Sequence, residues 1–358
     1  MSDIKDMKKK DITVIAFIVV LILACKSSPS EIQSEVPVDE MQDEIVYEYL
    51  PPDSIAPGTQ LVISQYREIW AYLVAGRENA LDHSHPISDL VYFGAEVDSY
   101  GKLTDIPNFR NIQTFRGRKH FVVACNSRAL THFVLKVGSN ERKALIEDLL
   151  DASRLYDGLQ IDFEYIPAKD GEYFLSFLRE LRAGLGNKIF SIALPARTKT
   201  LVDDVYDYKK IAPIVDRILI MAYDEHWSGS KPGPIASMRW CNLVARYALD
   251  TIGQEKLIMG LPFYGRSWGS INPNRALVYS SIDEIIQKEH VRNIHRENGI
   301  PMFTYHPDIT ATIYYEDAFS LSTRLEMYKK MGVGAVGFWR LGQETPAFWP
   351  VIELEKLP

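Results

Sequence analysis

Residues 156–165 have the sequence YDGLQIDFEY, in which apolar and polar side chains alternate. Successive side chains of a β-strand point to opposite faces, so this alternation predicts a strand with one apolar and one polar face. The polar face carries Gln160, Asp162 and Glu164. If that face points into a barrel, two acids and an amide lie beneath one pocket. Such a row costs folding free energy unless its members are hydrogen-bonded, which indicates a functional role.

Glu164 is the last acid of the segment, and Asp162 is its neighbour on the polar face. The negative charge of Asp162 is expected to raise the pKa of Glu164, which suits a general acid. The alternative is that the segment is a solvated strand edge without a catalytic role.

After residue 60 the chain alternates short apolar strands with helical patterns, which is typical of a parallel sheet built from strand–helix units. The predicted strands are Ile69–Val74, Leu90–Val97, His120–Ala124, Gly158–Phe163, Phe190–Leu194, Arg217–Ala222, Leu257–Pro262 and Ala335–Trp339. The predicted helices are Glu141–Ser153, Glu172–Leu185, Tyr208–Val215, Ile235–Ile252 and Ser320–Met331. This order predicts an α/β fold, a (β/α)8 barrel. A doubly wound open sheet is the alternative, but no glycine-rich phosphate loop follows the first strand.

The segment between the seventh and eighth predicted strands, residues 269–312, is longer than a simple crossover. It contains a helical pattern, Asp283–Arg296, and the aromatic stretch Met302–His306. We expect a small α+β insertion on the face of the barrel that carries the pocket, where loops commonly determine specificity. The alternative is that the insertion only adds packing.

The N-terminus combines Lys8–Lys10 with an almost uninterrupted apolar run at residues 12–24. The run is short for a membrane span and suits the apolar core of a secretory signal. Its end, Ile22–Cys25, resembles a bacterial lipobox, which implies that residues 1–24 are a lipoprotein signal peptide and that Cys25 is lipidated. An uncleaved anchor and an ordinary cleaved signal are the alternatives.

Residues 25–60 are rich in Ser, Pro, Asp and Glu, and no Lys or Arg follows Lys26 in this segment. Such a composition cannot bury a core and predicts a disordered acidic tether. Residues 61–358 would then form the barrel. A lipid on Cys25 and the tether together predict attachment to a membrane of a bacterial cell envelope, with the barrel in the periplasm or at the surface.

The 358-residue chain is 46% hydrophobic and carries a net charge of -7, which argues against a nucleic-acid partner. Cys125 and Cys241 do not have the spacing of a zinc site and are too few for a disulfide framework, so we expect buried thiols. His83 and His85 could indicate a metal. A solvated loop fits better because no carboxylate cluster accompanies them, and no metal is predicted.

Residues 157–164 resemble the signature of glycoside hydrolase family 18, the chitinase-like hydrolases, whose pattern is Asp-Gly-x-Asp-x-Asp-x-Glu. Asp157, Asp162 and Glu164 match the pattern, and Gln160 stands where the middle Asp is usual. The spore-cortex branch of the family, which cleaves peptidoglycan, commonly has Asn at that position.

Further motifs follow in the order that the family has them. Met221–Asp224 resembles the motif that ends the sixth strand, and Leu257–Trp268 resembles that of the seventh. Gly334–Gly342 resembles the last strand, and its Trp-x-Leu-Gly ending is similar to the spore-cortex branch. The third strand departs from the pattern, since Val123–Asn126 lacks the Ser-x-Gly-Gly of many chitinases.

The resemblance implies a substrate-assisted, retaining glycosidase, in which the N-acetyl oxygen of the substrate attacks the anomeric carbon. Glu164 would protonate the leaving oxygen and later activate water. Asp162 would hold the acetamido N–H and stabilise the positive intermediate, while Tyr223 would hydrogen-bond the acetamido oxygen. No cofactor is implied.

The resemblance also implies a substrate-binding set. Asp224 would contact the sugar, Trp339 would give it a flat apolar floor, Asp157 would orient Asp162 or the strand end from below, and Gln160 belongs to the set by its place in the motif. Tyr223 and Trp339 could instead be barrel core. Further residues that could contact sugar or only pack at the rim are Trp227, Tyr264, Trp268, Arg266 and Glu96.

The predicted function is hydrolysis of β-1,4-linked glycans that contain N-acetylglucosamine, of the peptidoglycan or chitin type, by a monomer. The first alternative is a catalytically inactive glycan-binding lipoprotein. A surface adhesion protein is the second alternative, and only the predicted anchor favours it.

Overall fold

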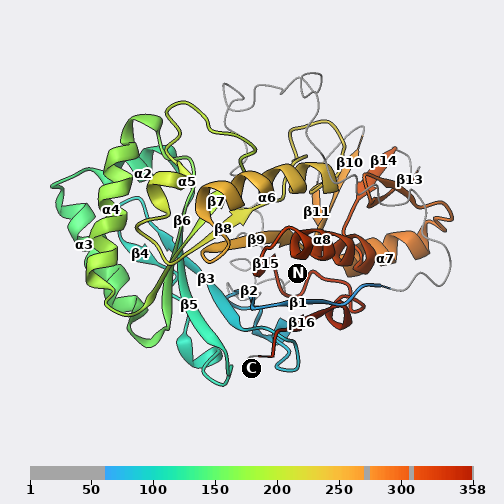
Figure 1. The fold of residues 1–358 in the computed structure, drawn as a ribbon, viewed down its shortest axis with the longest axis horizontal. Coiled ribbons are helices and arrows are strands. Elements are labelled where there is room, and N and C mark those ends of the chain that lie inside the picture. Colours follow the sequence, from blue (N-terminus) through green and yellow to red (C-terminus); the bar gives the residue numbers. More distant parts are fainter. Residues whose placement is uncertain (1–60, 270–274, 306–309, 357–358) are drawn as a thin grey trace, which may run out of the picture. The chain divides into compact units, whose positions relative to one another are not determined.

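Eight parallel strands form a closed barrel in the computed structural model, which describes residues 61–269, 275–305 and 310–356 (Figure 1). The barrel strands are β2 (Glu68–Val74), β3 (Asp89–Val97), β5 (Arg118–Cys125), β6 (Gly158–Phe163), β7 (Ile189–Pro195), β8 (Arg217–Met221), β9 (Leu257–Pro262) and β15 (Ala335–Trp339). They pair in the order β2-β15-β9-β8-β7-β6-β5-β3, and β2 also pairs with β3. The predicted (β/α)8 barrel is confirmed, and the open-sheet alternative is wrong because β2 has parallel neighbours on both sides.

The predicted signal peptide at residues 1–24, the tether at residues 25–60 and Cys25 lie outside the described residues. Among the helices that the structure does describe, none is both long enough and apolar enough for a membrane crossing.

Helices follow most barrel strands. They are α2 (Arg128–Leu135), α3 (Asn140–Ala152), α4 (Gly171–Gly184), α5 (Tyr208–Ile211), α6 (Met238–Ile252) and α8 (Ala318–Lys330). Ser139 and Ser237, which precede α3 and α6, each accept a hydrogen bond from a first-turn N–H that has no helical partner. Helix α2 was not predicted. Helix α5 ends four residues before the predicted Val215, because Pro213 has no N–H with which to continue it.

Short elements complete the barrel domain. Strand β1 (Ser64–Tyr66) pairs in parallel with β16 (Ile352–Leu354), and β4 (Leu103–Thr104) extends the barrel sheet antiparallel to β3. The 3-10 turns are η1 (Glu78–Ala80), η2 (Phe109–Asn111), η3 (Ser153–Leu155), η4 (Ala168–Asp170) and η5 (Trp349–Val351).

A second, antiparallel sheet is inserted between β9 and β15 (right side of Figure 1). Its elements are β10 (Gly265–Gly269), β11 (Arg275–Leu277), α7 (Tyr279–Lys288), β12 (His295–Glu297), β13 (Ile300–Tyr305) and β14 (Ala311–Tyr314), with sheet order β11-β10-β14-β13-β12. Ile282 of α7 packs against Phe303 and Ile313 of this sheet. The predicted helix Asp283–Arg296 is wrong in its bounds, because residues 295–297 pair with β13 as a strand.

The alternation of β6 separates two layers of core. Leu159, Ile161 and Phe163 belong to the large apolar cluster that includes residues of the surrounding helices. Gln160 and Asp162 are buried on the other face, so the solvated-edge alternative is wrong. The apolar side chains of the barrel interior are Trp70, Tyr72, Val91, Val122, Ala193, Leu219, Ile258 and Ala335, and Phe93, Ile189, Met221 and Trp339 pack against them.

Charged side chains fill the end of the barrel at which the strands begin. Asp89 is fully buried and accepts hydrogen bonds from Arg118 Nε at 2.6 Å and Nη2 at 2.7 Å, and its Oδ1 lies 2.7 Å from His120 Nε2. Glu68 accepts from Arg217 Nη2 at 2.7 Å. Burial alone raises the pKa of Glu68, but hydrogen bonds and positive charge, above all from Arg217, bring it down to about 2. We call Glu68, Asp89, Arg118, His120 and Arg217 the entry-end charge network.

Candidate active site

Gln160 lies inside the barrel below the acid pair and is fully buried. Its Oε1 accepts a hydrogen bond from the Tyr72 hydroxyl, and its Nε2 donates to Ser191 Oγ at 3.2 Å. An amide suits this position because it accepts and donates at once. Neutral partners from two other strands therefore enclose Gln160, and its place in the substrate-binding set stays a prediction.

Asp162 is one step further along the same interior face and is 8% exposed. Its Oδ1 is buried and has no hydrogen-bond partner among the described residues. Burial, and then the charge of Glu164, raise the pKa of Asp162 well above its ordinary value. A buried carboxylate oxygen without a partner is costly, and a donor from a bound molecule would remove that cost.

Glu164 is the first residue after β6, and its N–H donates to the Cys125 carbonyl at 3.0 Å. This bond continues the β5–β6 pairing and fixes the backbone that carries the acid. Burial, and then the charge of Asp224, raise the pKa of the half-buried Glu164 carboxyl. The pKa of Glu164 is therefore raised, as expected, although the main charge effect comes from Asp224 instead of Asp162.

Tyr223 follows β8 and is half-buried, with its ring 6.4 Å from that of Tyr264. Burial, and then the neighbouring Tyr72 and Tyr264 side chains, raise its pKa well above the ordinary value, so its hydroxyl stays protonated and can donate. A Cβ at Gly260 on the neighbouring strand would lie 3.2 Å from the Tyr223 ring and 2.7 Å from a backbone oxygen. A glycine at this position lets the ring lie against β9.

Asp224 has a backbone φ of 58°, an uncommon conformation for a residue other than glycine. Its Oδ1 accepts from the Tyr264 hydroxyl at 2.6 Å and from Arg266 Nη2 at 2.9 Å. Within the described residues its Oδ2 accepts no hydrogen bond, and the side chain is 43% exposed. Tyr264 and Arg266, two further candidates for sugar contact, hold Asp224 in place.

Trp339 is the last residue of β15 and is half-buried. Its ring centroid lies 5.3 Å from that of Tyr72 and 5.1 Å from that of Phe93, which meets it edge to face. The indole therefore packs on aromatic side chains of the barrel interior, and its exposed part is open to a ligand.

Asp157 does not join this group. It precedes the first residue of β6, at the opposite end of the strand from Glu164, and is exposed. Its Oδ2 accepts from the Lys119 backbone N–H at 2.8 Å, which fixes the start of β6 against β5. The length of the strand separates Asp157 from the acids, and its contact with Lys119 agrees with the expectation that it orients the strand end from below. Its place in the substrate-binding set stays a prediction.

The remaining aromatic and acidic candidates for sugar contact differ in burial. Trp268 is buried and packs edge to face on Tyr314 at 6.0 Å, so it belongs to the core of the insertion. Trp227 remains 38% exposed on the loop after β8. Glu96 lies near the end of β3, is exposed and has a pKa raised by burial and then by the charge of Asp105.

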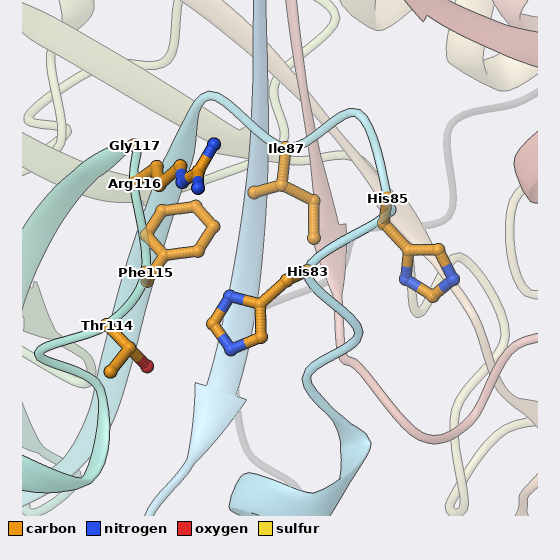
Figure 2. Close-up of a pocket in the computed structure, with 7 residues that line it drawn as sticks. All are labelled: His83, His85, Ile87, Thr114, Phe115, Arg116 and Gly117. Carbon is orange, nitrogen blue, oxygen red and sulfur yellow. The ribbon is translucent and has the colours of Figure 1, made fainter.

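His83 and His85 line a cavity of about 330 Å³ near the starts of β3 and β5, together with Phe115 and Arg116 (Figure 2). The His85 ring stacks on Trp349 at 4.0 Å, and the two imidazoles point in different directions in Figure 2. No group of three potential metal ligands from His, Cys, Asp and Glu occurs in the part of the chain that the structure describes.

Tyr72, Ser191 and Tyr206 were missed from sequence. The Tyr206 hydroxyl donates to the Phe163 carbonyl at 3.1 Å and accepts from the Ile166 N–H at 3.1 Å, and it therefore holds the loop that carries Glu164. Period-two alternation from Trp70 would have placed Tyr72 in the barrel interior. No comparable signal identifies the other two.

Residues 70–344 match the family model for glycosyl hydrolases family 18. The chain belongs to this family. Among family 18 relatives, the cortical fragment-lytic enzyme of Bacillus anthracis is 24% identical over 326 residues, 83% of this chain and 76% of the relative. The glycosylase YdhD of Bacillus subtilis (strain 168) is 30% identical over 239 residues, 62% of this chain. This chain spans only 56% of the length of YdhD.

Solved family 18 structures have the same fold. The spore cortex-lytic enzyme SleL of Bacillus cereus matches with a TM-score of 0.73 and 23% identity, covering 82% of this chain and 76% of that chain. A class V chitinase from Pseudomonas fluorescens Pf-5 matches with a TM-score of 0.71 and 22% identity, covering 80% of this chain and 98% of that chain. At these identities the likeness extends to the fold and not to the substrate.

Proposed function

We propose that this family 18 glycosyl hydrolase cleaves β-1,4-linked glycans at N-acetylglucosamine by substrate-assisted, retaining catalysis. The observation that carries the proposal is the buried Asp162 Oδ1, which has no partner among the described residues and lies on the same strand face as Glu164. An acetamido N–H would supply the missing donor, and the raised pKa of Glu164 favours the protonated form that a general acid needs.

In the first step the Glu164 carboxyl gives its proton to the bridging oxygen while the bond from that oxygen to the anomeric carbon breaks. The acetamido oxygen of the same sugar attacks the anomeric carbon, and a cyclic oxazolinium ion forms. The Asp162 carboxylate accepts the acetamido N–H and stabilises the positive charge, while the Tyr223 hydroxyl donates to the acetamido oxygen. Protein carboxylates then act as acid and as electrostatic stabiliser, and not as nucleophile.

In the second step the Glu164 carboxylate takes a proton from water, whose oxygen attacks the anomeric carbon and reopens the ring. Both displacements occur at the same carbon, so its configuration is retained. Asp224 Oδ2 remains open for a sugar hydroxyl, and Trp339 offers an apolar face on which a pyranose ring can stack.

Product analysis on N-acetylglucosamine oligomers and purified cell-wall sacculi, side by side, tests this proposal. The wild-type protein should release new reducing ends with retained configuration, and the Glu164→Gln variant should not. A wild-type protein that binds oligomers but releases no product would overturn the proposal in favour of a glycan-binding lipoprotein.

We also propose that Cys25 is lipidated and that the barrel is held at a membrane of the bacterial cell envelope as a monomer. The apolar run at residues 12–24 before Cys25 supports the anchor. Fractionation of cells that express the full chain tests it, since Cys25→Ala should move the protein from the membrane to the soluble fraction. An unchanged membrane fraction would contradict lipidation.

A further inference from the structure

The backbone around Glu164 lacks one of the two neighbours that a barrel strand normally has. The pairing of β6 with β5 continues to Phe163, but the pairing of β6 with β7 stops at Ile161, which lies opposite Ile192. Beyond Ile161 the β7 side of the chain therefore needs other hydrogen-bond partners, because buried backbone groups are rarely left unpaired.

The hydroxyl of Tyr206 supplies these partners. It donates to the Phe163 carbonyl at 3.1 Å and accepts from the Ile166 N–H at 3.1 Å, so one oxygen binds the backbone on both sides of Glu164. Between them Tyr165 has a φ of 57°, a conformation that a bulky residue adopts only when its surroundings hold it there. The Tyr206 side chain therefore closes the turn that begins with the acid.

The carboxyl group of Glu164 depends on this turn for its position. Within the described residues no hydrogen bond reaches the carboxyl group, whereas the N–H of the same residue donates to the Cys125 carbonyl at 3.0 Å. The direction of the side chain therefore follows from the backbone. Proton transfer needs the two heavy atoms within hydrogen-bond reach, so a small shift of the turn is enough to slow it.

An ion pair holds Tyr206 in turn. Arg197, two residues after β7, donates to Asp204 Oδ2 from Nε at 2.7 Å and to Oδ1 from Nη2 at 3.1 Å. The same Oδ1 accepts from the Tyr206 N–H at 3.1 Å, and the guanidinium carbon lies 5.9 Å from the centre of the Tyr206 ring. The Arg197 and Asp204 side chains are only 17% and 10% exposed, so solvent screens the pair little. The ion pair therefore fixes both the backbone and the ring of Tyr206.

We propose that Tyr206 is a positioning residue for the general acid, and that the Arg197–Asp204 ion pair holds Tyr206 in place. The segment after β7 would then determine how accurately the Glu164 carboxyl is aimed at the bridging oxygen. It acts through the backbone of Glu164 and needs no contact with the substrate. This inference rests on the proposed function.

Two glycosides of one N-acetylglucosamine oligomer separate proton transfer from the other requirements of the reaction. The first has a sugar as leaving group, which needs a proton, and the second has dinitrophenolate, which leaves as a stable anion without one. Tyr206→Phe should reduce kcat/KM for the first glycoside by about 10- to 100-fold, mainly through kcat, and for the second by less than about threefold. Reducing-end and absorbance assays measure the two rates.

Tyr208→Phe is the matched control. Tyr208 is buried, like Tyr206, and its hydroxyl donates to the carbonyl of Pro195, the last residue of β7, at 2.6 Å. This variant also loses a buried hydrogen bond, and its urea midpoint should fall, but the ratio of kcat/KM for the two glycosides should stay at the wild-type value. Equal losses on both glycosides in Tyr206→Phe, no loss on either, or the same change of ratio in Tyr208→Phe would overturn the positioning role.

Asp204→Ala tests the ion pair. It should lower kcat/KM for the glycoside with the sugar leaving group, and adding it to Tyr206→Phe should cause little further loss, because both changes act through one hydroxyl. Fully additive losses would overturn the role of the ion pair. Asp204→Ala also provides the comparison of the two leaving groups if Tyr206→Phe does not fold.

Amide hydrogen exchange at Ile166, measured without substrate, distinguishes this inference from the proposed function. Protection of the Ile166 N–H should fall in Tyr206→Phe and not in Tyr208→Phe. If the wild-type protein cleaves neither glycoside, the hydrolase proposal fails, and the exchange rates still show whether the hydroxyl holds the turn. If it cleaves both and Ile166 is equally protected in the two variants, the hydrolase proposal stands and the positioning role is overturned.

Discussion

Buried acids have basic partners at one end of the barrel and lie next to other acids at the other end. At the end where the strands begin, each acid of the entry-end charge network has basic partners, such as Arg118 and His120 on Asp89. At the other end Asp162 and Glu164 lie close together, with burial and like charge raising the pKa of both. Paired charge is compatible with stability, whereas unpaired acids are kept where a ligand or a reaction uses them.

The largest expected effect is on catalysis at the acid-pair end. Glu164→Gln should reduce kcat by about 100- to 10,000-fold, because the general acid is lost while the shape is kept. Reducing-end assays on oligomers measure it. Asp157→Asn, at the other end of the same strand, is the control and should retain nearly full activity. An equal loss of kcat in Glu164→Gln and Asp157→Asn would contradict the difference between the two ends.

At the entry end the expected effect is on stability. Asp89→Ala should lower the free energy of unfolding by about 3–5 kcal/mol, because Arg118 and the buried His120 lose their shared carboxylate. Urea unfolding followed by tryptophan fluorescence measures this. Asp162→Asn, which removes a buried negative charge beside Glu164, should leave stability equal or higher while abolishing activity. A larger stability loss in Asp162→Asn than in Asp89→Ala would contradict the comparison.

A smaller stability effect is expected at the floor of the site. Tyr72→Phe removes the hydroxyl that donates to Gln160 Oε1 and leaves that buried oxygen without a donor. The expected loss is about 1–3 kcal/mol. Thermal or urea unfolding measures it, and Tyr72→Phe combined with Gln160→Leu should recover part of the loss. A double variant no more stable than the single one would show that the hydrogen bond is not the cause.

The smallest effect is on how stability changes with pH, and its sign differs between the ends. Glu68 has a folded-state pKa lowered from 4.5 to about 2, so its contribution is present above pH 4.5 and is lost as the pH falls towards 2. Asp162 has a raised folded-state pKa, so its contribution is present below its ordinary pKa of 3.8 and is lost as the pH rises. Glu68→Gln should flatten the acid limb of a stability profile, and Asp162→Asn the limb above pH 4. If Glu68→Gln flattened the limb above pH 4, or Asp162→Asn flattened the acid limb, these directions would be contradicted.

Much of the barrel was predictable because strand alternation and strand–helix order depend on local sequence. All eight barrel strands begin and end within two residues of their predicted bounds. The same alternation places Gln160 and Asp162 on the interior face. It does not say how deep each lies, and depth separates the enclosed Gln160 from Asp162, whose carboxylate has an unused oxygen.

What the sequence did not reveal depends on contacts between distant elements. Asp157 belongs to the same motif as Glu164, but the two residues lie at opposite ends of β6. Ser191 and Tyr206 act through partners on other elements, so only the closed sheet brings them together.

The two cysteines of the described barrel are buried, and burial raises the pKa of both thiols to about 12. At neutral pH both thiols are protonated and buried, so we expect no reaction with maleimide reagents. In a version with Cys25 replaced, a cysteine introduced at the exposed Tyr165, one residue past Glu164, would give a single reactive thiol beside the acid pair. A fluorophore at that position could report glycan arrival in real time without a reducing-end assay.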